Sequence, residues 1–236
     1  MAVSSLWLRA AGAALCVLLV AGEAAADICV DVDLKVAGHN LSPLTEQTLQ
    51  SEAAALWQPY GVRIQWSTTR PAGRCSPVHA SFDVRVEYQP PPAGKAPRQI
   101  VLGSTQLVSG AIACAAILLD YDATEDLISS APATDLFTLV GQMQAGPADI
   151  GRALGRVLAH EIGHVLLGEA HHPRWGLMRK SFTASELVAH QRRSYTLSRE
   201  EVDRLRQRQD ELIGYGRELS ISPTFTRRLP TDAGRR

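Results

Sequence analysis

The segment His160-Glu161-Ile162-Gly163-His164 constrains this chain more than any other part of its sequence. Two histidines four residues apart lie one turn apart on the same face of a helix, close enough to bind one metal ion through their imidazole nitrogens. Glu161 follows the first histidine, where it can take a proton from a water molecule at the metal. The segment therefore predicts a helix that carries a catalytic zinc site.

A third protein ligand is needed, because catalytic zinc usually has three protein ligands and one position open for water. His171 and His172 follow the predicted helix and precede Gly176-Leu177-Met178. A loop residue reaches a metal by the path of the backbone and does not need the phase of the helix. Both histidines are therefore candidate third ligands, whereas His39, His79 and His190 lack metal-ligand neighbours.

Five strands are predicted from alternating or continuous apolar residues. The last of them is nearly all apolar, as expected for a strand that is covered on both faces. The predicted strands cover residues 29–36, 62–66, 82–88, 100–108 and 112–121. Asp120-Tyr121-Asp122 closes the last strand, where it could line a substrate cleft or simply form a turn.

Three helices are predicted from their end signals and apolar stripes. Ser42-Pro43 combines a capping side chain with proline at the first helical position, and Pro59-Tyr60-Gly61 ends that helix. The metal helix covers residues 147–167 and ends at Gly168. The last helix begins at Ser198 with a capping-box pattern and runs to about residue 213.

The first 26 residues are typical of a cleaved signal peptide. A short start with one positive charge precedes an apolar run, and Ala24-Ala25-Ala26 offers small residues for cleavage. The apolar run of about 13 residues is shorter than the roughly 20 that span a bilayer. We expect a mature chain that begins near Asp27, is secreted or periplasmic, and has no stable membrane span.

The mature chain is predicted to be one domain, residues 27–220, followed by a flexible basic tail, residues 221–236. Its 24 basic and 24 acidic residues give no electrostatic case for binding nucleic acid. Of the cysteines that remain after cleavage, Cys29 and Cys75 are the better candidates for a disulfide bond. Cys114 lies in an apolar run and is expected to be a small buried hydrophobe. The oligomeric state is left open.

The sequence resembles the metzincin-type zinc metallopeptidases, chiefly over residues 160–178. In that family the metal helix ends at a glycine, a third histidine follows, and a methionine turn lies beneath the metal. The matching residues are His160, Glu161, His164, Gly168 and Met178. The resemblance implies an α+β, zincin-like fold, in which a twisted mixed five-stranded sheet packs on the metal-binding helix and a C-terminal helix follows.

The spacing departs from the usual family pattern, which has glycine three residues and histidine six residues after the second ligand. Here Gly168 follows His164 by four residues, and His171 and His172 follow it by seven and eight. The sequence is similar to a branch of secreted bacterial metzincin-like proteins in which a histidine precedes the Gly-hydrophobic-Met segment by four residues. His172 has this spacing to Gly176, so the resemblance implies His172 as third ligand and His171 as the alternative.

The resemblance implies a secreted zinc peptidase that acts on a peptide or protein substrate. Zn²⁺ would be held by His160, His164 and His172, with Glu161 as general base. A thermolysin-like arrangement would instead use Glu186 as third ligand, and a non-catalytic zinc-fold binding module is the alternative from another class. Tyr195 is a candidate oxyanion donor only by its position after the methionine turn.

Overall fold

The computed structural model describes residues 28–38, 40–67, 80–88, 101–107, 114–130 and 145–221; within these, the side chains of Leu107, Cys114 and residues 213–221 are not described. The expected signal peptide and the tail after residue 221 lie outside these ranges and stay predictions. Cys29 is disulfide-bonded, but Cys75 lies outside the described residues, so the pairing also stays a prediction. Among the described helices, none is long and apolar enough to cross a membrane.

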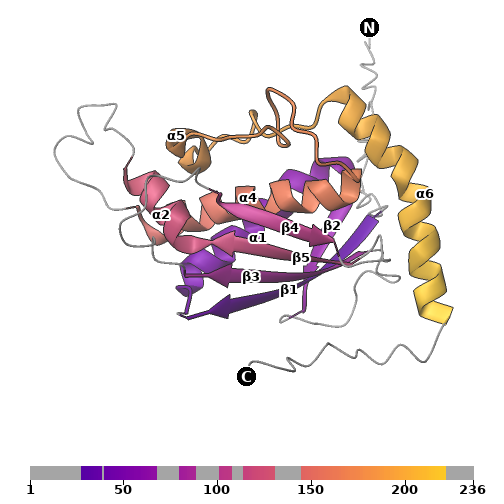
Figure 1. Ribbon diagram of the computed structural model, residues 1–236, viewed down its shortest axis with the longest axis horizontal. Coiled ribbons are helices and arrows are strands. Elements are labelled where there is room, and N and C mark those ends of the chain that lie inside the picture. The colour runs from indigo at the N-terminus through magenta and orange to yellow at the C-terminus, as the bar shows by residue number, and fades with distance from the viewer. Residues whose placement is uncertain are drawn as a thin grey trace, which may run out of the picture.

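One mixed sheet contains the five strands in the order β2-β1-β3-β5-β4 (Figure 1). Neighbouring strands run parallel, except that β4 pairs antiparallel with β5 at the edge of the sheet. The strands are β1 (Ile28–Ala37), β2 (Val62–Trp66), β3 (Ala80–Glu87), β4 (Gly103–Leu107) and β5 (Cys114–Asp120). Their ends agree with the predicted ends within three residues. β4 pairs with no other described strand, so its outer edge is free to border a site.

The helices are α1 (Pro43–Trp57), followed by a 3₁₀ turn (Gln58–Tyr60), then α2 (Tyr121–Ser129), α4 (Pro147–Leu167), α5 (Ala184–Val188) and α6 (Arg199–Ile221). The predicted start of α1 is confirmed, because the Ser42 side chain accepts a hydrogen bond from the Thr45 amide at 3.0 Å. The predicted α+β fold class is confirmed as well: a mixed five-stranded sheet packs on the metal helix, and a helix follows at the C-terminal end.

Two short helices were not predicted. The Asp120 side chain accepts a hydrogen bond from the Ala123 amide at 2.9 Å and caps α2, so the strand ends and a helix begins there. α5 starts with a capping box between Thr183 and Glu186. Both helices are shorter than the window of about 11–18 residues in which a helical period is read from sequence. The final helix conversely extends beyond the predicted residue 213 to Ile221.

Close contact between α1 and α4 depends on two glycines of α4. A Cβ atom at Gly151 would lie 2.5 Å from the Thr45 carbonyl oxygen, and one at Gly155 would lie 2.7 Å from that of Leu49. Only glycine lets the two backbones approach this closely. Both helices pack against the sheet (Figure 1). Their close contact with each other sets the position of α4 relative to the sheet.

A buried charge network holds the chain segment between α5 and α6 against α4. The Arg156 side chain is fully buried, and its Nε donates to Glu52 Oε1 at 2.8 Å. Arg192 Nε donates to the other Glu52 oxygen at 2.8 Å. Arg156 also donates to the Ala189 carbonyl oxygen at 2.6 Å and lies 4.5 Å from the centre of the Tyr195 ring. Helix α1, helix α4 and the segment after α5 therefore meet at one guanidinium group.

We predict that Arg156→Ala lowers the free energy of unfolding by about 3–5 kcal/mol, because it leaves the buried Glu52 carboxylate without its main partner. Arg206→Ala is the matched control, since its ion pair with Asp203 is exposed and is worth at most about 1 kcal/mol. Urea unfolding of the two variants measures both effects. Equal losses in the two variants would contradict this role for the network.

Candidate metal centre

Helix α4 carries His160, Glu161 and His164 in its last two turns and ends where the sequence predicts. Gly168 adopts the left-handed conformation with φ 66°, and the Glu169 amide then donates to the His164 carbonyl oxygen at 3.2 Å. A Cβ atom at Gly168 would also collide with the Arg208 guanidinium of α6. The left-handed backbone angle therefore favours glycine at this helix end.

Backbone carbonyls orient both helical histidines. His160 Nδ1 lies 2.9 Å from the Leu177 carbonyl oxygen, and His164 Nδ1 lies 2.7 Å from that of Glu169. A carbonyl oxygen only accepts hydrogen bonds, so each Nδ1 must carry the hydrogen. The two Nε2 atoms then present lone pairs, and they face each other at 3.1 Å.

This arrangement fits a metal ion. Two nitrogen lone pairs at 3.1 Å repel one another unless a cation lies between them. Zn–N bonds of about 2.0–2.1 Å in tetrahedral geometry separate two ligand nitrogens by about 3.3 Å. One ligand atom of His172 joins the two Nε2 atoms, and all three lie within 4.8 Å of one another. Three imidazoles form a donor set that suits zinc.

The protonation of these rings is also compatible with metal binding. Burial lowers the pKa of His160 to about 4, and burial likewise lowers the pKa of His172. Both rings are therefore neutral at pH 7, the form in which imidazole binds a metal ion.

The structure distinguishes among the candidate third ligands by their position. His172 lies with His160 and His164, and its ring centre is 5.3 Å from that of His160. His171 is exposed and is not part of this group. The Glu186 carboxylate forms an ion pair with Arg179 at 2.9 Å and caps α5, away from the histidines. The structure thus brings together the three histidines that the sequence pattern favours.

Met178 is buried and packs beside Gly163, the glycine inside the metal motif. A Cβ atom at Gly163 would collide with the Met178 sulfur, so the glycine inside the metal motif leaves room for this side chain. The preceding Leu177 amide donates to the Thr196 carbonyl oxygen at 3.0 Å. The turn is therefore fixed from both sides while its Leu177 carbonyl orients His160.

Tyr195 does not occupy the position of an oxyanion donor. It is 1% exposed and stacks on Phe182, with the ring centres 5.3 Å apart. The Phe182 and His160 rings pack edge to face, with their centres 5.8 Å apart. Phe182 lines the cleft, whereas Tyr195 does not line it. Tyr195 therefore packs behind Phe182, which itself contacts His160.

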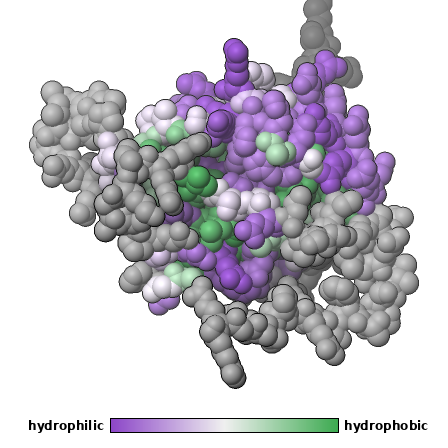
Figure 2. Space-filling model, in the orientation of Figure 1, coloured by the Kyte–Doolittle hydropathy of each residue, from purple (hydrophilic) through white to green (hydrophobic). Residues whose placement is uncertain are grey.

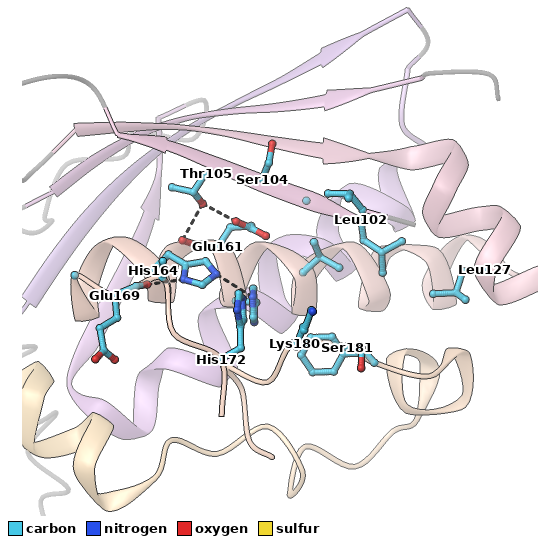
Figure 3. A pocket seen from close by; sticks show the side chains of 17 residues that line it. Leu102, Ser104, Thr105, Leu127, Glu161, His164, Glu169, His172, Lys180 and Ser181 are labelled. Atoms are coloured by element: carbon cyan, nitrogen blue, oxygen red, sulfur yellow. Dashed lines mark hydrogen bonds between the residues drawn. The ribbon is translucent and has the colours of Figure 1, made fainter. Parts of the chain in front are cut away.

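Glu161 lies beside the histidine cluster and is bound by a residue of the edge strand (Figure 3). The Thr105 hydroxyl donates to Glu161 Oε2 at 2.6 Å and lies 3.2 Å from the Glu161 carbonyl oxygen. Burial raises the pKa of the Glu161 carboxyl, while the Thr105 hydrogen bond and His164 lower it. The sequence offered no local signal for Thr105, because the contact joins residues 56 positions apart.

A cleft of about 1040 Å³ opens above these groups, between β4, the end of α4 and the segment around residues 180–182. Figure 2 shows apolar residues near the middle of the face that it draws, with hydrophilic residues above and below them. The apolar part of the lining is Val101, Leu102, Leu127, Val157 and Phe182. The cleft therefore combines a polar centre, made by the histidines and Glu161, with apolar walls.

Comparisons with known proteins show a similarity of fold and no match of sequence. No protein-family model and no curated protein matches the sequence. Among solved structures, the fold is similar to that of an archaemetzincin from Methanopyrus kandleri, with 13% identity and a TM-score of 0.42. The alignment covers 78% of this chain and 96% of that chain.

We predict that His172→Ala weakens zinc binding by more than about 100-fold, since even residues that only orient a ligand are worth about 10–100-fold. His171→Ala is the matched control and should leave zinc affinity nearly unchanged, because this ring lies outside the cluster. Competition with a chromogenic chelator measures both affinities. The opposite ranking would assign the third ligand position to His171.

We also predict energetic coupling between Thr105 and Glu161 in the metal-free protein. Thr105→Val keeps the shape but removes the donor, and should cost about 1–3 kcal/mol by leaving a buried carboxylate oxygen unpaired. The cost should fall by at least half in a Glu161→Ala background, and Thr105→Ser should restore most of the stability. Urea unfolding of the four members of this double-mutant cycle tests the contact. An equal cost in both backgrounds would contradict it.

Proposed function

We propose that this protein is a zinc-dependent peptidase that hydrolyses peptide bonds in the cleft beside β4. The observation that carries this proposal is the convergence of His160, His164 and His172 on one wall of the cleft, with the Glu161 carboxylate next to them but bound to Thr105. Three neutral ligands hold zinc and leave one coordination position open, as in catalytic rather than structural sites.

The three histidines would hold the zinc ion, which supplies Lewis acidity toward a water molecule and toward the substrate carbonyl. Thr105 holds Glu161 Oε2, so the Glu161 carboxylate is fixed in one orientation beside the metal position. In this orientation Glu161 accepts a proton from the attacking water and returns it to the leaving nitrogen. A substrate that covered the apolar walls would displace water from the cleft and strengthen these electrostatic interactions.

An extended peptide fits the open edge of the sheet. β4 pairs with β5 on one side only among the described strands, and Gly103, Ser104 and Thr105 line the cleft. Unpaired backbone groups of an edge strand bind an extended peptide by adding it as a further strand. Such a peptide would run past Glu161 and the histidine cluster, which supports a peptide bond as the group that is cleaved.

Export is part of the proposal and rests on residues 1–26, whose pattern predicts a signal peptide. A peptidase that acts outside the cytoplasm would meet peptide or protein substrates there. A non-catalytic zinc-fold binding module is the alternative, and the following experiment separates the two.

We predict that Glu161→Gln keeps the zinc content and the melting temperature but lowers peptide hydrolysis by about 10²–10⁴-fold, because an amide cannot accept the proton. Glu186→Gln is the control, since this carboxylate lies outside the cleft and should affect neither zinc nor hydrolysis. A chelator should abolish the activity, and added zinc should restore it. If zinc-loaded protein cleaved no member of a broad peptide library, the binding-module alternative would replace the peptidase.

A further inference from the structure

Three charged side chains other than histidines line the cleft among the described residues: Glu161, Glu169 and Lys180. Glu161 accepts a hydrogen bond from Thr105, and Glu169 forms an ion pair with Arg204 of α6. Lys180, in contrast, has no hydrogen bond or ion pair within the described part of the chain. The cleft therefore contains one positive charge without a described partner.

The position of Lys180 follows from its two neighbours in the methionine-turn segment. Met178 is buried against Gly163, and Phe182 packs edge-on against His160 at 5.8 Å. Lys180 lies between these two anchored residues, so its backbone is held close to the metal centre. In Figure 3 its side chain points from this segment toward α4, near His172.

The adjacent Arg179 has a different role, although it also carries a positive charge. Its guanidinium forms an ion pair with Glu186 at 2.9 Å and lies 4.6 Å from the centre of the Phe182 ring. Arg179 does not line the cleft, and its charge is paired with the Glu186 carboxylate. Of the two neighbouring cations, only Lys180 is available to a molecule in the cleft.

On the basis of the peptidase function proposed above, we propose that Lys180 binds a carboxylate group of the peptide substrate, close to the scissile bond. Leu102, Leu127 and Phe182 line the same cleft, and among its described lining side chains Lys180 is the lysine or arginine that a carboxylate would meet. The group is either an acidic side chain or the free C-terminus of the peptide. Lys180 is exposed, and an ion pair of this kind favours acidic peptides by about fivefold.

Binding of matched peptides to zinc-loaded Glu161→Gln protein tests the proposal, because binding is measured without hydrolysis. The probes are fluorescent peptides of about six apolar residues, the length of one strand, with Glu, Gln or Lys placed at each position in turn. Each is made with a free and with an amidated C-terminus. We expect a preference of about fivefold for a carboxylate-bearing peptide, which weakens in high salt. The Glu and free-terminus series show which carboxylate is bound.

The preference should disappear in Lys180→Gln and reverse toward the lysine peptides in Lys180→Glu, each in the same Glu161→Gln background. Arg174→Gln is the control, because Arg174 is an exposed cation nearby that does not line the cleft, and it should keep the preference. If Lys180→Gln weakened all peptides equally, or left the preference intact, the proposal would be wrong. Selective binding without hydrolysis by the wild-type protein would retain the carboxylate site and remove the peptidase function.

Discussion

Two backbone carbonyl groups determine what the metal centre can be. The Leu177 and Glu169 oxygens receive the Nδ1 hydrogens of His160 and His164, and this leaves both Nε2 lone pairs facing one point. The helical spacing of the two histidines places their rings on one face but does not decide which nitrogen faces the cleft. The backbone that follows α4 determines which ring nitrogen of each histidine faces the cleft. The path of this segment is therefore as important to the site as the histidines themselves.

The positions of these two carbonyls depend on contacts from distant parts of the chain. Gly168 turns the backbone so that the Glu169 carbonyl reaches His164, and Arg204 of α6 holds the Glu169 side chain. The Leu177 turn is fixed by the Thr196 carbonyl and by Met178 packed into the space left by Gly163. Beyond it, the Arg156 network fastens the segment after α5 to both α1 and α4. The metal site therefore depends on the buried charges as well as on the core.

The parts of the fold that could be predicted are those with a local signal. The strands alternate or are continuously apolar, α1 has its capping serine, and α4 has both its metal motif and its terminal glycine, so each is visible in consecutive residues. α2 and α5 were missed because they are shorter than the window of about 11–18 residues in which a helical period is read, although Asp120 and Thr183 cap them. The spacing to Gly176 already favoured His172 over His171 through the family resemblance, and the structure places His172 beside the other two histidines. Thr105 could not be predicted at all, since its partner lies on another element.

We propose that three imidazoles hold one zinc ion and leave one position open. X-ray absorption spectroscopy at the zinc edge tests it most directly on the purified full-length chain with one equivalent of zinc. We expect three imidazole nitrogens and one further light ligand at about 2.0–2.1 Å, and a loss of imidazole scattering in the His172→Ala variant. Sulfur ligands at about 2.3 Å, or a spectrum unchanged by that substitution, would rule out zinc held by these three histidines.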